Sequence, residues 1–154
     1  MIDMNNRELI EFADELAEIA GDYPKEAKKF LKKEAVELRK KTVVEMNSQV
    51  GRKTGNLIKG IKAGKVYRYR ENDNLSVRVY GGKPAHHAHL IDRGHRIVVP
   101  HNWRKKPRKR GGGEVKGRAK AFPFFQPAGE KFEDEFKNDC QEFLDDLIIG
   151  RIGK

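Results

Sequence analysis

Apolar residues follow a helical spacing in two consecutive stretches of the first fifty residues. The first stripe ends at Gly21 and consists of Leu9, Phe12, Ala13, Leu16, Ile19 and Ala20. The second begins after Tyr23-Pro24, because proline suits the first turn of a helix, and it runs to about Gln49. Its apolar positions are Ala27, Phe30, Leu31, Ala35, Leu38 and Met46. The pattern therefore predicts two amphipathic helices within residues 1–50.

Alternation of apolar and polar residues replaces the helical spacing after these stretches. Residues 66–70 and 75–80 both alternate, and the Glu-Asn-Asp-Asn sequence between them is typical of a hairpin turn. Residues 57–63 and 97–99 are further candidates for the same sheet. Alternation indicates a sheet with one buried face, which the helices would cover. We therefore expect a hairpin and sheet region over residues 51–100.

Helical spacing returns near the C-terminus. Residues 121–128 hold three phenylalanines and two prolines, which disfavour a continuous helix there, so the aromatic rings need pockets in the core or on a neighbouring molecule. The stripe that follows consists of Phe132, Phe136, Cys140, Phe143, Leu144, Leu147 and Ile148. We predict a single α+β domain over residues 1–154, with two N-terminal helices and a C-terminal helix packed on a small antiparallel sheet. The Phe/Pro segment and the C-terminal helix would occupy residues 121–149.

Positive charge is concentrated between Arg93 and Lys120. Eleven Lys or Arg stand there against one acid, Glu114, so this stretch alone carries the net +10 of the whole chain. Prolines and a run of three glycines disfavour helix and strand, so residues 101–120 are predicted to form a long basic, Gly-rich loop. The side chains expected to bind nucleic acid or a partner are Arg104, Lys105, Lys106, Arg108, Lys109, Arg110, Lys116, Arg118 and Lys120.

The basic loop has more than one possible role. Cationic loops are attracted to phosphate backbones, because each neutralised phosphate releases condensed counterions without any readout of base sequence. They also serve solubility or bind an acidic partner subunit. The chain itself is acidic over residues 1–22 and 127–149, so a neighbouring copy is as suitable a partner as DNA. Charge alone leaves these alternatives open.

The composition predicts a soluble, unexported chain with a lean core. Hydrophobic residues make up 37% and charged residues 36% of the chain, and the mean hydropathy is -0.81, so we expect help from oligomerisation. The lone Cys140 permits no intrachain disulfide and no cysteine zinc site, which fits a reducing cytosol or a particle assembled there. No apolar run approaches the ~18 residues of a membrane span.

Five histidines cluster within residues 86–101 and invite a metal-site or nuclease interpretation. They are His86, His87, His89, His95 and His101. Asp92 is the single acid among them, and their spacing matches no HExxH or Cys/His template. We expect no catalytic residue, no cofactor and no metal. A stand-alone basic nucleic-acid-binding protein, or a small nuclease that uses this cluster, is the alternative.

Three short segments follow one another in a recognisable order. Thr54-Gly55-Asn56-Leu57 follows the helices, His87-Ala88-His89-Leu90-Ile91-Asp92-Arg93-Gly94-His95 follows the hairpin, and residues 117–128 precede the last helix. In this order they resemble the gene-product-ten-like tail-completion family of long-tailed phages and prophages, over roughly residues 7–149. The second segment keeps the family's apolar pair, acid and glycine but lacks its aromatic residue and threonine. The third is richer in aromatic residues than the family pattern.

The resemblance implies a structural protein of the phage neck or upper tail without enzymatic activity. Such a protein would form a ring, expected to be a hexamer, where capsid and tail meet, and neck, tail-terminator or tail-tube proteins would be its partners. It would be located in the virion, and in the host cytoplasm during assembly. Contractile tails and bacteriocin-like particles fit equally well. The packing or interface set would be Leu90, Ile91, Gly94, Phe122, Phe124 and Phe125.

Overall fold

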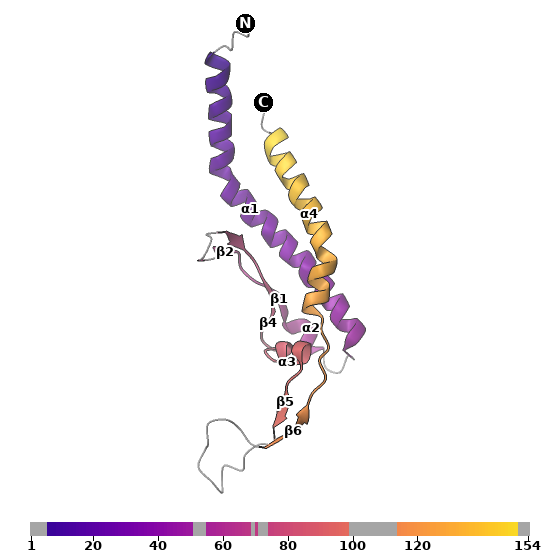
Figure 1. The fold of residues 1–154 in the computed structure, drawn as a ribbon. Coiled ribbons are helices and arrows are strands. Elements are labelled where there is room, and N and C mark those ends of the chain that lie inside the picture. The colour runs from indigo at the N-terminus through magenta and orange to yellow at the C-terminus, as the bar shows by residue number, and fades with distance from the viewer. Residues whose placement is uncertain (1–5, 51–54, 69, 71–73, 99–113, 151–154) are drawn as a thin grey trace. The chain divides into compact units, whose positions relative to one another are not determined.

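The computed structural model describes residues 6–50, 55–68, 70, 74–98 and 114–150. In chain order the elements are α1 (Asn6–Gln49), α2 (Asn56–Gly60), β1 (Ile61–Ala63), β2 (Tyr67–Arg68), β3 (Leu75–Ser76), β4 (Val79–Gly81), α3 (Ala88–Arg93), β5 (Arg96–Val98), β6 (Val115–Arg118) and α4 (Phe125–Ile149) (Figure 1). Long helices with small antiparallel sheets confirm the predicted α+β class.

The chain forms two compact units. The first unit contains Met1–Arg39, Ala63–Val79 and Glu130–Lys154, and the second contains Lys40–Lys62 and Tyr80–Gly129. Both α1 and α4 therefore contribute residues to each unit.

The N-terminal residues form one helix, whereas the sequence pattern predicts two. Helix α1 continues through Gly21 and Pro24 and ends at Gln49, which is the predicted end. A proline inside a helix removes one backbone hydrogen bond and bends the helix, and Figure 1 shows α1 changing direction part-way along its length. Ile19 before the proline and Ala27 after it are both buried. Apolar burial thus occurs on both sides of Pro24 and opposes the local cost of about 3 kcal/mol, although Phe12 and Leu16 of the first predicted stripe are exposed.

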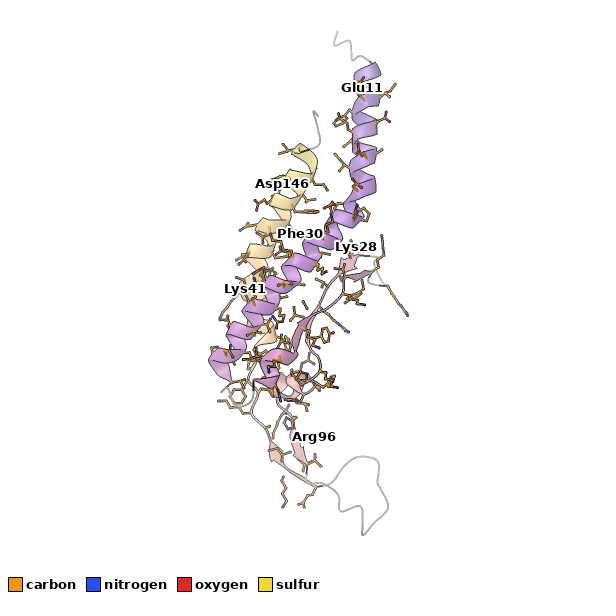
Figure 2. The ribbon with its side chains drawn as sticks, turned by 180° about the vertical axis from the view of Figure 1, so that it is seen from behind. Glu11, Lys28, Phe30, Lys41, Arg96 and Asp146 are labelled. Carbon is orange, nitrogen blue, oxygen red and sulfur yellow. The ribbon has the colours of Figure 1, made fainter. Side chains whose placement is uncertain are left out.

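Aromatic rings connect the helical parts of the first unit. The ring of Phe30 stacks on that of Phe143 with centroids 4.7 Å apart and lies 6.1 Å from that of Phe136. Figure 2 shows Phe30 on the side of α1 that faces α4. The ring of Tyr23 is 6.5 Å from that of Phe143. These contacts show that the apolar faces of α1 and α4 pack on each other in the first unit, a pairing that the sequence pattern did not specify.

The predicted hairpin of residues 66–80 is present in the first unit. Strands β2 and β3 pair antiparallel, with Tyr67 opposite Ser76. The second predicted strand is divided, because residues 75–76 pair with β2 whereas β4 pairs with β1. The one sheet that the pattern predicts is therefore realised as three two-stranded sheets, the third being β5 with β6. Strands of two to four residues are too short to propagate pairing across a wider sheet.

Small residues allow close backbone packing in the second unit. The N–H of Gly82 donates to the carbonyl of Gly60 at 2.7 Å. A Cβ atom on Gly60 would collide with Ala85, and one on Gly81 would lie 2.5 Å from the Cβ of Ala88. Of the candidate strand at residues 57–63, the first part is helix α2 and the remainder is β1. The start of α3 therefore packs directly against the end of β4, and Ala85 before α3 packs against the end of α2.

Candidate assembly site

A tertiary cap joins α3 to the start of α4 within the second unit. The Oδ1 atom of Asp92 accepts hydrogen bonds from the backbone N–H groups of Phe124, at 2.9 Å, and Phe125, at 3.1 Å. Helix α4 begins at Phe125, and the first N–H groups of a helix have no partner inside it. A carboxylate at this position satisfies two of them and interacts favourably with the positive end of the helix dipole.

The same two chain segments meet again around Gly94. This residue has a φ of 69°, and a Cβ atom there would lie 2.6 Å from the carbonyl oxygen of Ala119. Ala119 donates its N–H to the carbonyl of His95 at 2.8 Å, and Phe122 donates to Ile91 at 3.0 Å. Residues 87–95 and 117–128, which the sequence singled out separately, therefore form one substructure.

This substructure holds the base of an antiparallel ribbon, β5 with β6. The ribbon pairs Arg96 with Arg118, Ile97 with Gly117 and Val98 with Val115, and its register shifts between Ile97 and Val98. The predicted strand at residues 97–99 is thus present as β5 in its described part. Residues 115–118, which fall within the predicted basic loop, form strand β6.

The predicted packing or interface set divides by exposure. Phe124 is fully buried and is a core residue of the second unit. Ile91, Gly94, Phe122 and Phe125 are half-buried, and Leu90 is exposed. The ring of Phe125 lies 4.7 Å from that of Phe124, centroid to centroid. An interface formed by this set stays a prediction, and Leu90 is its member most available to a partner.

The predicted basic set is described in part. Lys116 and Arg118 lie in β6 and are exposed, as is Lys120, whose Nζ atom is 5.5 Å from the centroid of the Phe122 ring. The other members lie outside the described residues, namely Arg104, Lys105, Lys106, Arg108, Lys109 and Arg110. The register adds Arg96, which the sequence pattern did not single out although it belongs to the same positive stretch (Figure 2).

The comparison with protein-family models matches residues 8–94 to a phage family described as "Bacteriophage HK97-gp10, putative tail-component". The chain belongs to this family. The match spans more than half of the chain and covers the first recognised segment and the second up to Gly94, so the resemblance seen in the sequence is confirmed. No curated protein and no solved structure matches the chain.

As a phage tail component, the chain is part of the virion and interacts with other structural proteins of the particle. Among its described helices, none combines the length and the apolar character that crossing a bilayer requires.

The described histidines of this tail component make local backbone contacts. His86, His87, His89 and His95 are exposed. The Nδ1 atom of His89 is 2.9 Å from the carbonyl oxygen of His86, and that of His95 is 3.4 Å from the carbonyl oxygen of Leu90. His101 lies outside the described residues. Within residues 6–50, 55–68, 70, 74–98 and 114–150, no group of three His, Cys, Asp or Glu side chains is arranged to hold a metal ion.

The first unit of the tail component contains a buried acid that the sequence pattern did not reveal. Glu34 is 2% exposed, and among the described residues its two carboxyl oxygens have no hydrogen-bond partner. Burial raises the pKa of Glu34, and the nearby Asp139 carboxylate raises it further. Lys33, whose Nζ lies 3.9 Å from Glu34 Oε1, acts in the opposite direction. Burial also raises the pKa of the Cys140 thiol, with Glu34 contributing.

Proposed function

We propose that this tail component is a tail-completion or head-tail joining protein and forms part of a ring, a hexamer, in the neck or upper tail. Its role there is structural and not catalytic. The observation that carries the proposal is the way residues 87–95 and 117–128 hold the base of the basic stretch between them. A basic stretch whose flanking segments are anchored to each other is suited to contact a partner or the passing genome.

Exposed apolar residues support association with other subunits. Ile97 and Val115, on the paired strands β5 and β6, are 48% and 49% exposed, and neighbouring exposed apolar side chains are typical of protein interaction sites. When one patch of a subunit binds a different patch of the next subunit, the contacts close into a ring if the rotation between subunits permits it. Neck, tail-terminator or tail-tube proteins would occupy the remaining surface.

The basic stretch is proposed to contact DNA or a neighbouring subunit. Phosphate attraction without base readout suits a duplex that slides through a ring, because a sequence-specific grip would arrest its passage. The acidic residues of a neighbouring copy are the competing partner. Removing the positive charges of the basic stretch and measuring particle yield tests whether the stretch is required for assembly.

The proposed location is tested by deleting the gene and supplying it from a plasmid. Without the chain, electron microscopy should show DNA-filled heads and separate tails, and wild-type protein should restore joined particles. Mass spectrometry of heads and tails dissociated from the restored particles would then place the chain and count its copies. Joined, infectious particles in the absence of the chain would overturn the proposal, as would cleavage of DNA by the purified protein.

The role of the basic stretch is tested by complementation with a variant in which six side chains are changed to Gln. These are Arg104, Lys105, Lys106, Arg108, Lys109 and Arg110. We expect fewer completed particles although the protein stays soluble. A matched control changes six exposed lysines of α1 to Gln, namely Lys25, Lys28, Lys29, Lys32, Lys33 and Lys40. Equal yields from both variants would show that the basic stretch has no special role.

A further inference from the structure

We propose that the β5–β6 ribbon of one copy binds the acidic helical end of the next copy, an inference that rests on the proposed ring. The acidic helical end comprises residues 10–22 of α1 and 138–149 of α4, all within the first unit. The partner is a second copy of this chain. The contact is heterologous, since a different surface of each copy takes part, and it therefore has the geometry that generates rings.

The ribbon has no buried face of its own. Every residue of β5 and β6 is exposed, including the apolar side chains of Ile97, Val98 and Val115, which are 48%, 40% and 49% exposed. A two-stranded ribbon is at best marginally stable in water unless it packs on another element. The tertiary cap and Gly94 hold its base, whereas its strands need an external surface to cover these side chains.

The charge on the ribbon indicates that this external surface is acidic. Arg96 and Arg118 are directly opposite each other, and like charges at such cross-strand positions destabilise the pairing. Among the described residues, neither guanidinium forms an ion pair. A carboxylate placed between them would turn repulsion into two attractions, so the ribbon is more stable when it is bound to an acidic surface.

The acidic helical end offers the matching surface. Its two segments carry nine acids and no Lys or Arg, and the start of α1 and the end of α4 lie at the same end of the first unit in both figures. Exposed apolar side chains lie among the acids, and they are Ile10, Phe12, Leu16, Leu144, Ile148 and Ile149. Both surfaces therefore combine apolar side chains with charge, and the charges are opposite in sign.

The apolar residues favour protein over DNA as the partner of the ribbon. A duplex backbone presents phosphates that would satisfy Arg96 and Arg118, but it offers no counterpart for Ile97, Val98 and Val115. The acidic helical end satisfies both requirements at once. The six cations within residues 104–110, by contrast, would suit an acidic protein surface and DNA equally well.

Charge reversal on each surface tests the contact, using the purified full-length chain. Arg96→Glu with Arg118→Glu makes the ribbon acidic, and Glu15→Lys with Asp145→Lys places bases at the helical end. Each double variant alone should associate at least tenfold more weakly than wild type in sedimentation velocity at low salt. In an equimolar mixture each ribbon meets an oppositely charged helical end, so association should return. Lys83→Glu and Asp134→Lys, exposed residues outside both surfaces, are the matched controls and should leave association unchanged.

Crosslinking locates the contact in assembled particles. A copy with Cys140→Ser and Val98→Cys and a copy with Cys140→Ser and Leu144→Cys should form a disulfide-linked heterodimer when coexpressed. Intermolecular crosslinks in a particle fraction other than the neck would support the contact while overturning the proposed location. A neck ring without this crosslink would overturn the contact and leave the proposed location intact.

Each of three results would overturn the proposed contact between the ribbon and the acidic helical end. In the first, mixing the two charge-reversed variants restores nothing. In the second, Arg96→Glu with Arg118→Glu abolishes DNA binding and leaves self-association as in wild type, which assigns the ribbon to DNA. In the third, a single chain with Cys140→Ser, Val98→Cys and Leu144→Cys forms the disulfide within itself, whereas the two coexpressed single-cysteine copies form no heterodimer.

Discussion

The carboxylate of Asp92 accepts a hydrogen bond from the backbone N–H of Phe124 at 2.9 Å across 32 positions of sequence. This contact ties the short helix α3 to the start of α4 and thereby connects the two chain segments that flank the β5–β6 ribbon. Asp92, which belongs to one of the segments that resemble the family, is thus a helix cap in the structure.

Removing this cap should destabilise the second unit. We expect Asp92→Ala to lower the free energy of unfolding by about 1–2 kcal/mol, because two N–H groups at the start of α4 lose their acceptor. Asp92→Asn keeps a carbonyl oxygen and should cost less. Urea unfolding measures both, with Asp134→Ala as the control, since the Asp134 side chain is 96% exposed. A cost for Asp92→Ala no larger than that of the control would contradict the capping role.

Substitution of Gly94 should be costly for two separate reasons. An alanine would have to adopt a φ of 69° and would place its Cβ 2.6 Å from the Ala119 carbonyl oxygen, so we expect a loss of about 1–3 kcal/mol. Gly129→Ala is the matched control, because Gly129 lies in α4 with open space around it. That change should stabilise the helix by about 0.5–1 kcal/mol. Thermal unfolding of the two variants should therefore shift in opposite directions.

Phe124 and Leu90 should separate folding from assembly. Phe124 is fully buried, so Phe124→Ala should cost about 3–5 kcal/mol. Leu90 is 36% exposed, and Leu90→Ala should cost about 1 kcal/mol or less. If Leu90 lies in an interface, its variant will fold normally but complete fewer particles. Normal particle yields from a folded Leu90→Ala protein would remove this residue from the interface set.

Glu34 should make the stability of the first unit depend on pH. Because burial and Asp139 raise the pKa of the folded-state carboxyl, the folded chain binds more protons than the unfolded chain between the two pKa values. The contribution of Glu34 to stability is therefore highest below its unfolded pKa of about 4.3 and is lost as pH rises through its folded pKa. Glu34→Gln should be more stable than wild type at pH 7, and the difference should shrink toward pH 4. Equal pH profiles for the two proteins, measured by thermal unfolding, would show that Glu34 does not titrate abnormally.

Local periodicity was sufficient to predict much of the secondary structure. The apolar stripes around Phe30 and Phe143 place the long helices, and the alternation around Tyr67 and Leu75 places a hairpin. Periodicity works here because a helix or strand buries one face along its own length, and the residues of that face recur at regular intervals in the sequence.

Periodicity failed where the deciding contact involved residues distant in sequence. A proline at position 24 is a local signal for a helix start, but α1 continues through it, with Ile19 buried before it and Ala27 buried after it. Likewise, the charges and glycines before Val115 predicted a loop, whereas pairing with β5 makes residues 115–118 a strand.

The amino-acid sequence thus determined the α+β class, the family and the concentration of positive charge between Arg93 and Lys120. Tertiary structure decided which of those charges face each other, which phenylalanine is core, and that Asp92 caps α4. The physical reason is range: helical and strand periodicity depends on neighbours along the chain, whereas the Arg96–Arg118 pair and the Asp92–Phe124 hydrogen bond depend on register and packing between segments more than twenty residues apart.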